Sequence, residues 1–315
     1  MGGADDPTES SSQQLTGALV SALRKEWSDS VRPTSENFDA PRFVESRILG
    51  SQNEFKSESD WLNRWVLLFD HMIAYHYLAF SCYSRAIELR PSVRVLCFYS
   101  IYSAIFDDLY AIRILITHGR ELAARKILRS VAEYFDVLLL LYFDSSLAPA
   151  YFSAQDSESA NRFWHSTLAK GKPRKQIEKA LADSDSMLLY RLLRDRNEEE
   201  LSMLSQLVHP SYASSLFTFL PPADIALEEA HFEFSYALDF SVRTIKHVLT
   251  LTLAAVVLLE QLPLCSDQAL GDELLNYDTK SELHQATTLA KTLMFKYLKM
   301  VLVETDEFFI VDNST

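Results

Sequence analysis

The scarcity of helix-breaking residues is the feature that most constrains this chain. Its 315 residues include only 7 glycines and 10 prolines. Neither residue type occurs within residues 60–90 or 92–118. Because Gly and Pro usually mark the ends of helices and the positions of turns, these stretches predict long helices with short connections. Strand-like alternation is limited to FFIVD near the C-terminus, which is too short to assign.

The prolines and their neighbours delimit the predicted helices. Ser59 or Asp60 suits an N-cap and Pro91 ends the first long helix. Every proline lies at such a boundary or in the N-terminal region, so the assignments agree with one another. The other predicted helices span 92–118, 120–143, the 150s and 160s as far as Gly171, a short segment from Pro173, 186–209, 224–262, and a pair within 267–303.

These helices predict an all-α fold, because short connections between long helices favour antiparallel neighbours in one bundle. Residues 1–12 are predicted to form a disordered tail and residues 13–58 short N-terminal helices. Residues 59–262 form the predicted helical core. Residues 263–315 complete the chain with C-terminal helices and a tail.

Charge and cysteine content restrict the partners and the compartment. The chain carries 30 Lys and Arg against 43 Asp and Glu, a net charge of −13. An acidic balance opposes non-specific binding to phosphate backbones, which requires clustered positive charge. The three cysteines are far apart and form no CxxC, so we expect reduced thiols in a cytoplasmic protein. The polar N-terminus lacks the pattern of a signal peptide.

One apolar run points to packing against a partner. Residues Val248–Leu259 are uncharged, yet the run is shorter than the roughly 18 residues that a membrane span needs. The run is apolar on nearly all sides, whereas a bundle helix needs only one apolar stripe. The surplus face should pack on another helix or on a second subunit, and we predict a homodimer with no membrane partner.

The sequence LSQLVHPSYA, residues 204–213, contains a candidate site at a helix end. His209 precedes Pro210, and a residue before proline leaves the helical region. Ser205 lies one turn earlier on the same face. Two interpretations remain open: His209 caps the last carbonyl groups, or it works with Ser205 in chemistry. The chain has no G-x-S-x-G elbow, which argues against a hydrolase.

A second candidate lies in RSVAE, residues 129–133. Arg129 and Glu133 are four residues apart on a helix that is otherwise strongly apolar. If the pair is buried it needs partners, because an unpaired buried charge is costly. We therefore predict that Arg129, Glu133, Ser205 and His209 converge, with Arg129 and His209 within about 12 Å, given helix-packing distances of roughly 8–10 Å.

The patterns R-S-x-x-E and L-S-x-x-V-H-P-S together resemble the uncharacterised bacterial helical proteins near the HEPN domains, close to abortive-infection proteins of the AbiV kind. The resemblance covers roughly residues 60–260. It implies a compact helical bundle, often dimeric, whose relatives act as ribonuclease toxins or nucleotide-binding modules in bacterial conflict and stress. By motif it singles out Arg129, Glu133, Ser205 and His209, with Ser211 after the proline.

The chain departs from the ribonuclease pattern at one point. HEPN ribonucleases share an Arg separated from a later His by four to six residues. The corresponding positions before His209 hold Ser202, Met203 and Leu204. Whether this chain is an enzyme is therefore left open by its sequence.

Two hypotheses follow. In the first, the protein is a defence or stress effector that binds, or binds and cuts, RNA or a nucleotide. Arg129 would then contact phosphate, Glu133 would orient it or His209, and His209 would act as acid, base or hydrogen-bond donor. In the second, the protein is a non-enzymatic module: the same residues form a buried polar network, and the function lies in a protein partner.

Other charged groups favour structural roles. Glu228 and His231 form one Glu-x-x-His, whereas a di-iron bundle needs two such motifs and two further carboxylates. Asp107 and Asp108 suit an exposed edge or a metal. KGKPRKQIEK, residues 170–179, suits a solvated loop or an anionic partner. A polar stripe at multiples of four comprises His231, Asp239, Arg243 and His247. No phosphate-binding Gly-rich loop, zinc spacing or haem motif occurs, so no cofactor or metal is predicted.

Overall fold

The fold is all-α in the computed structural model of the protein, as the sequence predicts. The structure describes residues 20–29, 39–49, 60–89, 91–118, 120–182, 239–261 and 281–303, together with single positions 187, 188, 190, 191, 194, 195 and 198. This part of the chain is about 91% helical and has no strand. The HEPN-like core and the single antiparallel bundle stay predictions.

The chain divides into two compact units. The first comprises Met1–Ala79 and Thr279–Thr315, and the second comprises Phe80–Asp278. Helix α3, Asp60–Leu89, contributes to both units. It begins and ends within two residues of the predicted boundaries, because nothing between Ser59 and Pro91 breaks a helix.

The first unit is built around aromatic side chains. Its helical elements are residues 20–29, α2 (Ala40–Phe43), the π-helical turn η1 (Val44–Ile48), the first part of α3, and α13 (Glu282–Val303). Trp27 and Tyr297 both lie edge-on to the ring of His71, with centroids 6.3 Å away in each case. His71 is buried, neither of its ring nitrogens has a hydrogen-bond partner, and burial lowers its pKa to about 4. The core imidazole is therefore neutral.

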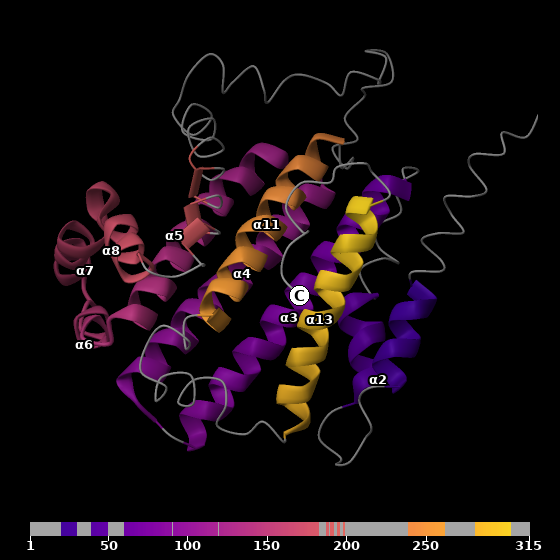
Figure 1. Ribbon diagram of the computed structural model, residues 1–315, viewed down its shortest axis with the longest axis horizontal. Helices are drawn as coiled ribbons and strands as arrows, with labels where there is room; N and C mark the ends of the chain where they lie inside the picture. Colours follow the sequence, from indigo (N-terminus) through magenta and orange to yellow (C-terminus); the bar gives the residue numbers. More distant parts are fainter. Residues whose placement is uncertain are drawn as a thin grey trace, which may run out of the picture. The chain divides into compact units, whose positions relative to one another are not determined.

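The second unit places α5 at its centre. Helices α4 (Val93–Thr117), α5 (Glu121–Phe143) and α11 (Asp239–Gln261) run side by side, and α5 contacts both others (Figure 1). Short helical elements gather at one end of α5, and α8 among them packs against α5. They are α6 (Leu147–Phe152), α7 (Ser157–Phe163), η3 (Trp164–Leu168), η4 (Ala169–Gly171) and α8 (Lys172–Ala180).

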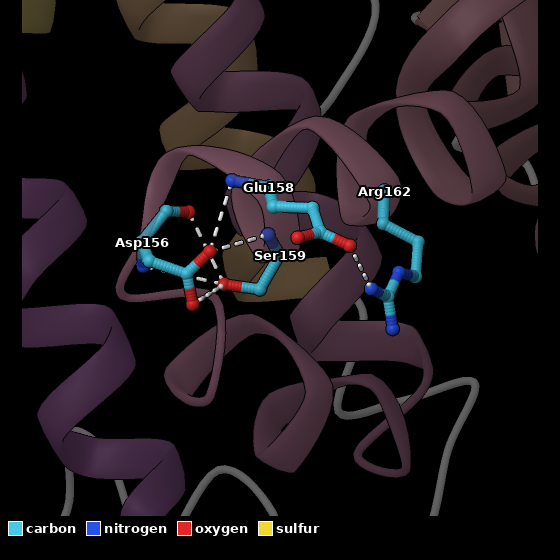
Figure 2. A network of polar contacts seen from close by, with 4 residues as sticks. All are labelled: Asp156, Glu158, Ser159 and Arg162. Atoms are coloured by element: carbon cyan, nitrogen blue, oxygen red, sulfur yellow. Dashed lines mark hydrogen bonds and ion pairs between the residues drawn. The ribbon is translucent and has the colours of Figure 1, made fainter.

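The helix ends follow local chemistry. The Ser92 hydroxyl accepts a hydrogen bond from the Val95 amide at 3.1 Å, which caps α4 where the sequence predicts its start. The prediction of one helix through the 150s and 160s is wrong, because Asp156 starts a new helix. Its carboxylate accepts hydrogen bonds from the amides of Glu158 and Ser159 at 2.9 and 2.8 Å, and the Ser159 hydroxyl accepts from the Asp156 amide (Figure 2). This capping box fixes α7.

Helix α11 buries the apolar run that the sequence analysis selected. Of Val248–Leu259, only Thr250 and Val257 are partly exposed. The surplus apolar face therefore packs within the chain, where α11 contacts α5. By length and composition, two helices in the described part are apolar enough to cross a membrane: Val93–Thr117, 44% buried, and Val242–Leu259, 78% buried. A mostly buried core helix passes the same test, so this finding is weak evidence for a membrane span.

Candidate functional site

Helix α5 carries Arg129 and Glu133, the charged pair predicted from the sequence, together with two further charged residues, Glu121 and Arg125. Glu121, Arg125, Arg129 and Glu133 follow one another at intervals of four residues. A helix turns about 100° per residue, so each interval of four moves the side chain about 40° around the axis. Glu121 and Glu133 therefore point about 120° apart, and they meet different surroundings.

The first two of these residues form a buried ion pair, here called the inner pair. Arg125 Nε donates to Glu121 Oε1 at 3.0 Å, and the two side chains are 3% and 10% exposed. The Thr244 hydroxyl of α11 donates to the same carboxylate oxygen. The network therefore links two helices that lie far apart in sequence through one buried carboxylate.

The second two residues form an exposed ion pair, here called the outer pair. Arg129 Nε donates to Glu133 Oε1 at 3.1 Å, and the side chains are 49% and 60% exposed. The outer pair therefore does not lie on a buried face, because its angle around the helix places it at the surface. Solvent screens the pair, and each charge neutralises the other.

Asp136 lies between the two pairs in angle, about 60° from Glu121 around the axis. Accordingly, its side chain is half-buried. Its pKa is raised to about 7, chiefly by removal from water and also by the neighbouring charge of Glu133, while Arg174 of α8 opposes the shift. Asp136 thus exchanges protons near neutrality, which is a requirement for a general acid or base at physiological pH.

Arg174 and Arg194 join α8 to the residues of the 190s. Arg174 pairs with Glu178 at 3.7 Å between Nε and Oε1, and it also pairs with Glu198. Arg194 pairs with Glu178 and with Asp195. Arg174 and Arg194 thus contact three carboxylates between them, so the positive charge of both arginines is matched within the cluster.

Three tyrosines of the second unit have raised pKa values. Tyr190 is 3% exposed, and burial together with the charge of Asp136 raises its pKa. Burial, followed by the charges of Asp108 and Glu133, raises the pKa of Tyr134. Burial raises the pKa of Tyr151 to about 12. These phenols remain protonated at neutral pH and can serve only as neutral hydrogen-bonding groups there.

Of the four predicted site residues, the structure describes Arg129 and Glu133 and brings them into contact. Ser205, His209 and Ser211 lie outside the described residues, as do Glu228 and His231. The convergence of Arg129 with His209 therefore stays a prediction. In the polar stripe of α11, Arg243 is exposed whereas His247 is buried.

The basic segment around residue 172 is helical where a loop was favoured. Lys172 Nζ donates to the carbonyl oxygens of His165 and Ser166 at 2.9 and 2.8 Å, so its charge stabilises the end of η3. Pro173 occupies the first turn of α8, as predicted. Arg174 is engaged with carboxylates, which reduces the positive charge available to an anionic partner.

Sequence reasoning missed Glu121, Arg125, Asp136 and Thr244. The signal was present in the helical phase of α5. Arg125 lies three residues before Leu128 and seven before Ala132, both of which are buried. Arg129 instead lies three residues after Lys126, which is exposed. The phase of a charged residue relative to the apolar stripe therefore predicts its burial better than the character of the whole helix does.

Metal ligands and cysteines are two further classes of candidate site. Within the described ranges, no group of three or more His, Cys, Asp or Glu side chains is arranged to hold a metal ion. Cys82 and Cys97 are buried free thiols, and Cys265 lies outside the described part.

No family model, curated protein or solved structure matches the chain.

Proposed function

We propose that this protein is a non-enzymatic helical interaction module in which buried polar contacts hold α5 against α11. The single observation that carries the proposal is that the buried inner pair of α5 is hydrogen-bonded to Thr244 of α11. Arg125, Glu121 and Thr244 connect two core helices, and their side chains lie away from solvent. A buried network of this kind can fix the register between helices. Function then depends on the surfaces that those helices present to a protein partner.

The outer pair supports the same proposal. Binding of RNA or a nucleotide needs cations free to contact phosphate, whereas Arg129 is held by Glu133 at 3.1 Å. Arg174 and Arg194 are also matched with carboxylates. The net charge of −13 acts in the same direction.

The test compares matched substitutions of the two arginines. Arg129→Met and Arg125→Met remove the same charge from the same helix, so thermal melts can be run beside RNA-binding, RNA-cleavage and growth assays. The proposal expects a large loss of stability from Arg125→Met, a small one from Arg129→Met, and no RNA or nucleotide activity in wild type. Wild-type nuclease or nucleotide binding that Arg129→Met abolishes without altering the melt would refute it.

His209→Ala belongs in the same experiment. A capping role within a buried network expects a stability loss of roughly 1–3 kcal/mol, the usual cost of an unsatisfied buried partner. Loss of activity or toxicity with an unchanged melting temperature would instead assign chemistry to His209. That result would favour the effector hypothesis.

One observation favours that second candidate, a defence or stress effector that acts on RNA or a nucleotide, as the HEPN-like resemblance implies. The pKa of Asp136 is raised to about 7, beside Arg174 and Glu133. A carboxyl that titrates near neutrality next to an arginine has the properties of an acid–base group beside a phosphate ligand. Strongly perturbed carboxyls also occur in structural networks, so the interaction module remains our conclusion.

Asp136→Asn tests the second candidate, with Glu158→Gln, at an exposed carboxylate of α7, as the control. An effector that uses Asp136 should show an RNA-cleavage rate that depends on pH around 7, and Asp136→Asn should remove that dependence whereas Glu158→Gln should retain it. The cytoplasmic location, the homodimer and the protein partner are proposals to be tested beside it, by fractionation, light scattering and affinity capture from the native host.

A further inference from the structure

Helix α4 has an exposed face with the spacing of a helix–helix seam. Its most exposed residues are Val93, Ser100, Asp107, Tyr110 and Ile114, and Leu96, Ser103 and Thr117 are less exposed on the same side. These eight positions, here called the α4 stripe, follow one another at alternating intervals of three and four residues. That spacing is the a and d pattern by which one helix packs lengthwise against another.

The opposite face of α4 is already occupied by the core of its own unit. Val95, Phe98, Ile101, Ile105 and Leu109 are at most 1% exposed, and α4 contacts α5 along its length. In contrast, Val93, Tyr110 and Ile114 of the stripe are 39%, 55% and 44% exposed. From Val93 to Thr117 the stripe extends for about 36 Å at a rise of 1.5 Å per residue.

We infer that the α4 stripe is a self-association surface, on which α4 of a second copy of this chain packs in antiparallel orientation about a two-fold axis at the level of Ile105. Antiparallel helices pair an a position of one with a d position of the other. That register sets Leu96 opposite Ile114 of the second copy, Ser100 opposite Tyr110, and Ser103 opposite Asp107.

Each of these pairings is complementary. Leu96 and Ile114 bury apolar surface at both ends of the seam. The small Ser100 leaves room for the large Tyr110, which is how facing layers interdigitate. The Ser103 hydroxyl can donate a charge-assisted hydrogen bond to the Asp107 carboxylate. Because the axis is two-fold, every pairing occurs twice.

The alternatives fit the stripe less well. A parallel second copy would set Asp107 against Asp107 and Ser100 against Ser100, which combines charge repulsion with a packing gap. A lipid surface would have to accept Ser100, Ser103 and Asp107 at the middle of the stripe, and a charge deep in a bilayer is costly. Self-complementarity of the whole stripe therefore favours a second copy.

This inference rests on the proposed function in one respect, that the chain is an interaction module. It adds that one partner is a second copy of the chain. The first test is sedimentation of the full chain. Wild type should dimerise at micromolar concentration, and Ile114→Lys should weaken dimerisation at least tenfold with an unchanged melt. Leu188→Lys is the matched control, because Leu188 is apolar, 67% exposed and outside the stripe. A monomeric wild type, or equal weakening by both variants, would overturn the inference.

Disulfide trapping tests the orientation. Leu96→Cys and Ile114→Cys are placed in separate copies, with Cys265→Ser in both, while Cys82 and Cys97 remain because they are buried. Oxidation of the mixture should give the heterodimer linked from residue 96 to residue 114, identified by mass spectrometry. Disulfides that join residue 96 to residue 96 would overturn the antiparallel register.

A flotation assay with vesicles of phosphatidylcholine and phosphatidylglycerol separates the lipid alternative. The inference expects no flotation, and flotation that Ile114→Lys abolishes would overturn it. Failure of these tests leaves the proposed module unaffected, since that proposal is tested by the arginine variants and the RNA assays rather than by self-association.

Discussion

The inner and outer pairs of α5 have the same chemistry and opposite surroundings. Both join an arginine to a glutamate four residues away, at 3.0 and 3.1 Å. Their side chains are 3% and 10% exposed in the inner pair and 49% and 60% exposed in the outer pair. A twist of about 40° between the two arginines, and of about 120° between the two glutamates, around one helix accounts for the difference. Identical contacts therefore differ in energetic consequence because of where the helix points them.

The largest expected effect comes from breaking the inner pair. Arg125→Met leaves the Glu121 carboxylate buried without its cation, and removal of one partner of a buried pair costs about 3–5 kcal/mol. Denaturant unfolding measures the loss. Adding Glu121→Leu to Arg125→Met should recover most of it, since no buried charge remains. A loss from Arg125→Met below about 1 kcal/mol, the scale of surface pairs, would show that the inner pair is not buried in solution.

Asp136 sharpens the comparison through its pH dependence. Its pKa is raised from 3.8 to about 7, so the folded state binds the proton more tightly than the unfolded state does. Stability that is present below pH 4 is then lost as the pH rises towards 7. Asp136→Asn should remove this loss, so the variant should be more stable than wild type by of order 1–3 kcal/mol at pH 8. Melting temperatures across pH 4–8 check it, and an unchanged profile in the variant would contradict the burial of Asp136.

His71 extends the comparison to the other unit, where a buried ionisable group has no ion partner. Its pKa is lowered from 6.5 to about 4, so the unfolded state binds the proton more tightly. Stability that is present above pH 6.5 is lost as the pH falls towards 4. His71→Leu should reduce that acid sensitivity, by of order 1–2 kcal/mol at pH 4. The exposed His118→Gln is the control, and equal pH profiles for both variants would refute the prediction.

A substitution of Thr244 measures how much the hydrogen bond between the inner pair and α11 contributes to stability. Thr244→Val keeps the side-chain shape and removes the hydroxyl that donates to Glu121. The expected cost is about 1.5 kcal/mol, at the lower end of the range for hydrogen bonds to charged groups. In a double-mutant cycle, Thr244→Val should cost little once Glu121→Leu and Arg125→Met are present. Full additivity in that cycle would show that the hydroxyl and the pair are independent.

The smallest effect is expected for the outer pair. Arg129→Met should change stability by less than about 0.5 kcal/mol, because exposed i,i+4 pairs contribute about that much. The change should shrink further at 1 M salt, where exposed charges are screened. Denaturant titrations at low and high salt measure both. A cost near that of Arg125→Met would instead show that Arg129 is buried in the core, and the two pairs would then not differ in burial.

The apolar helices α4 and α11 also differ in how much of their surface is buried. In sequence, α11 contains the more continuous apolar run, and its surplus face was predicted to pack on another helix or on a second subunit. In the structure α11 is almost entirely buried, whereas α4 keeps a row of exposed positions. Composition alone therefore selected a helix with an apolar surplus but not the helix whose surplus faces outward.

Local chemistry in the sequence predicts most helix boundaries correctly. Ser92 starts α4, Pro91 follows α3, and Pro173 opens α8, as expected from caps and from the missing amide of proline. The break before α7 was also readable, because Asp156 and Ser159 have the spacing of a capping box. The predicted convergence of Ser205 and His209 with Arg129 concerns residues beyond the described part and stays a prediction.

The sequence by itself determined the all-α class, most of the described helix ends and the pairing of Arg129 with Glu133, because each depends on residues within a turn of one another. Only the tertiary structure decided which arginine of α5 is buried, which half-buried carboxyl faces Arg174, and which side of α4 stays open. The physical reason is that burial depends on the angle of each side chain around its helix and on what packs there. Contacts between distant segments, such as Thr244 with Glu121, set that packing.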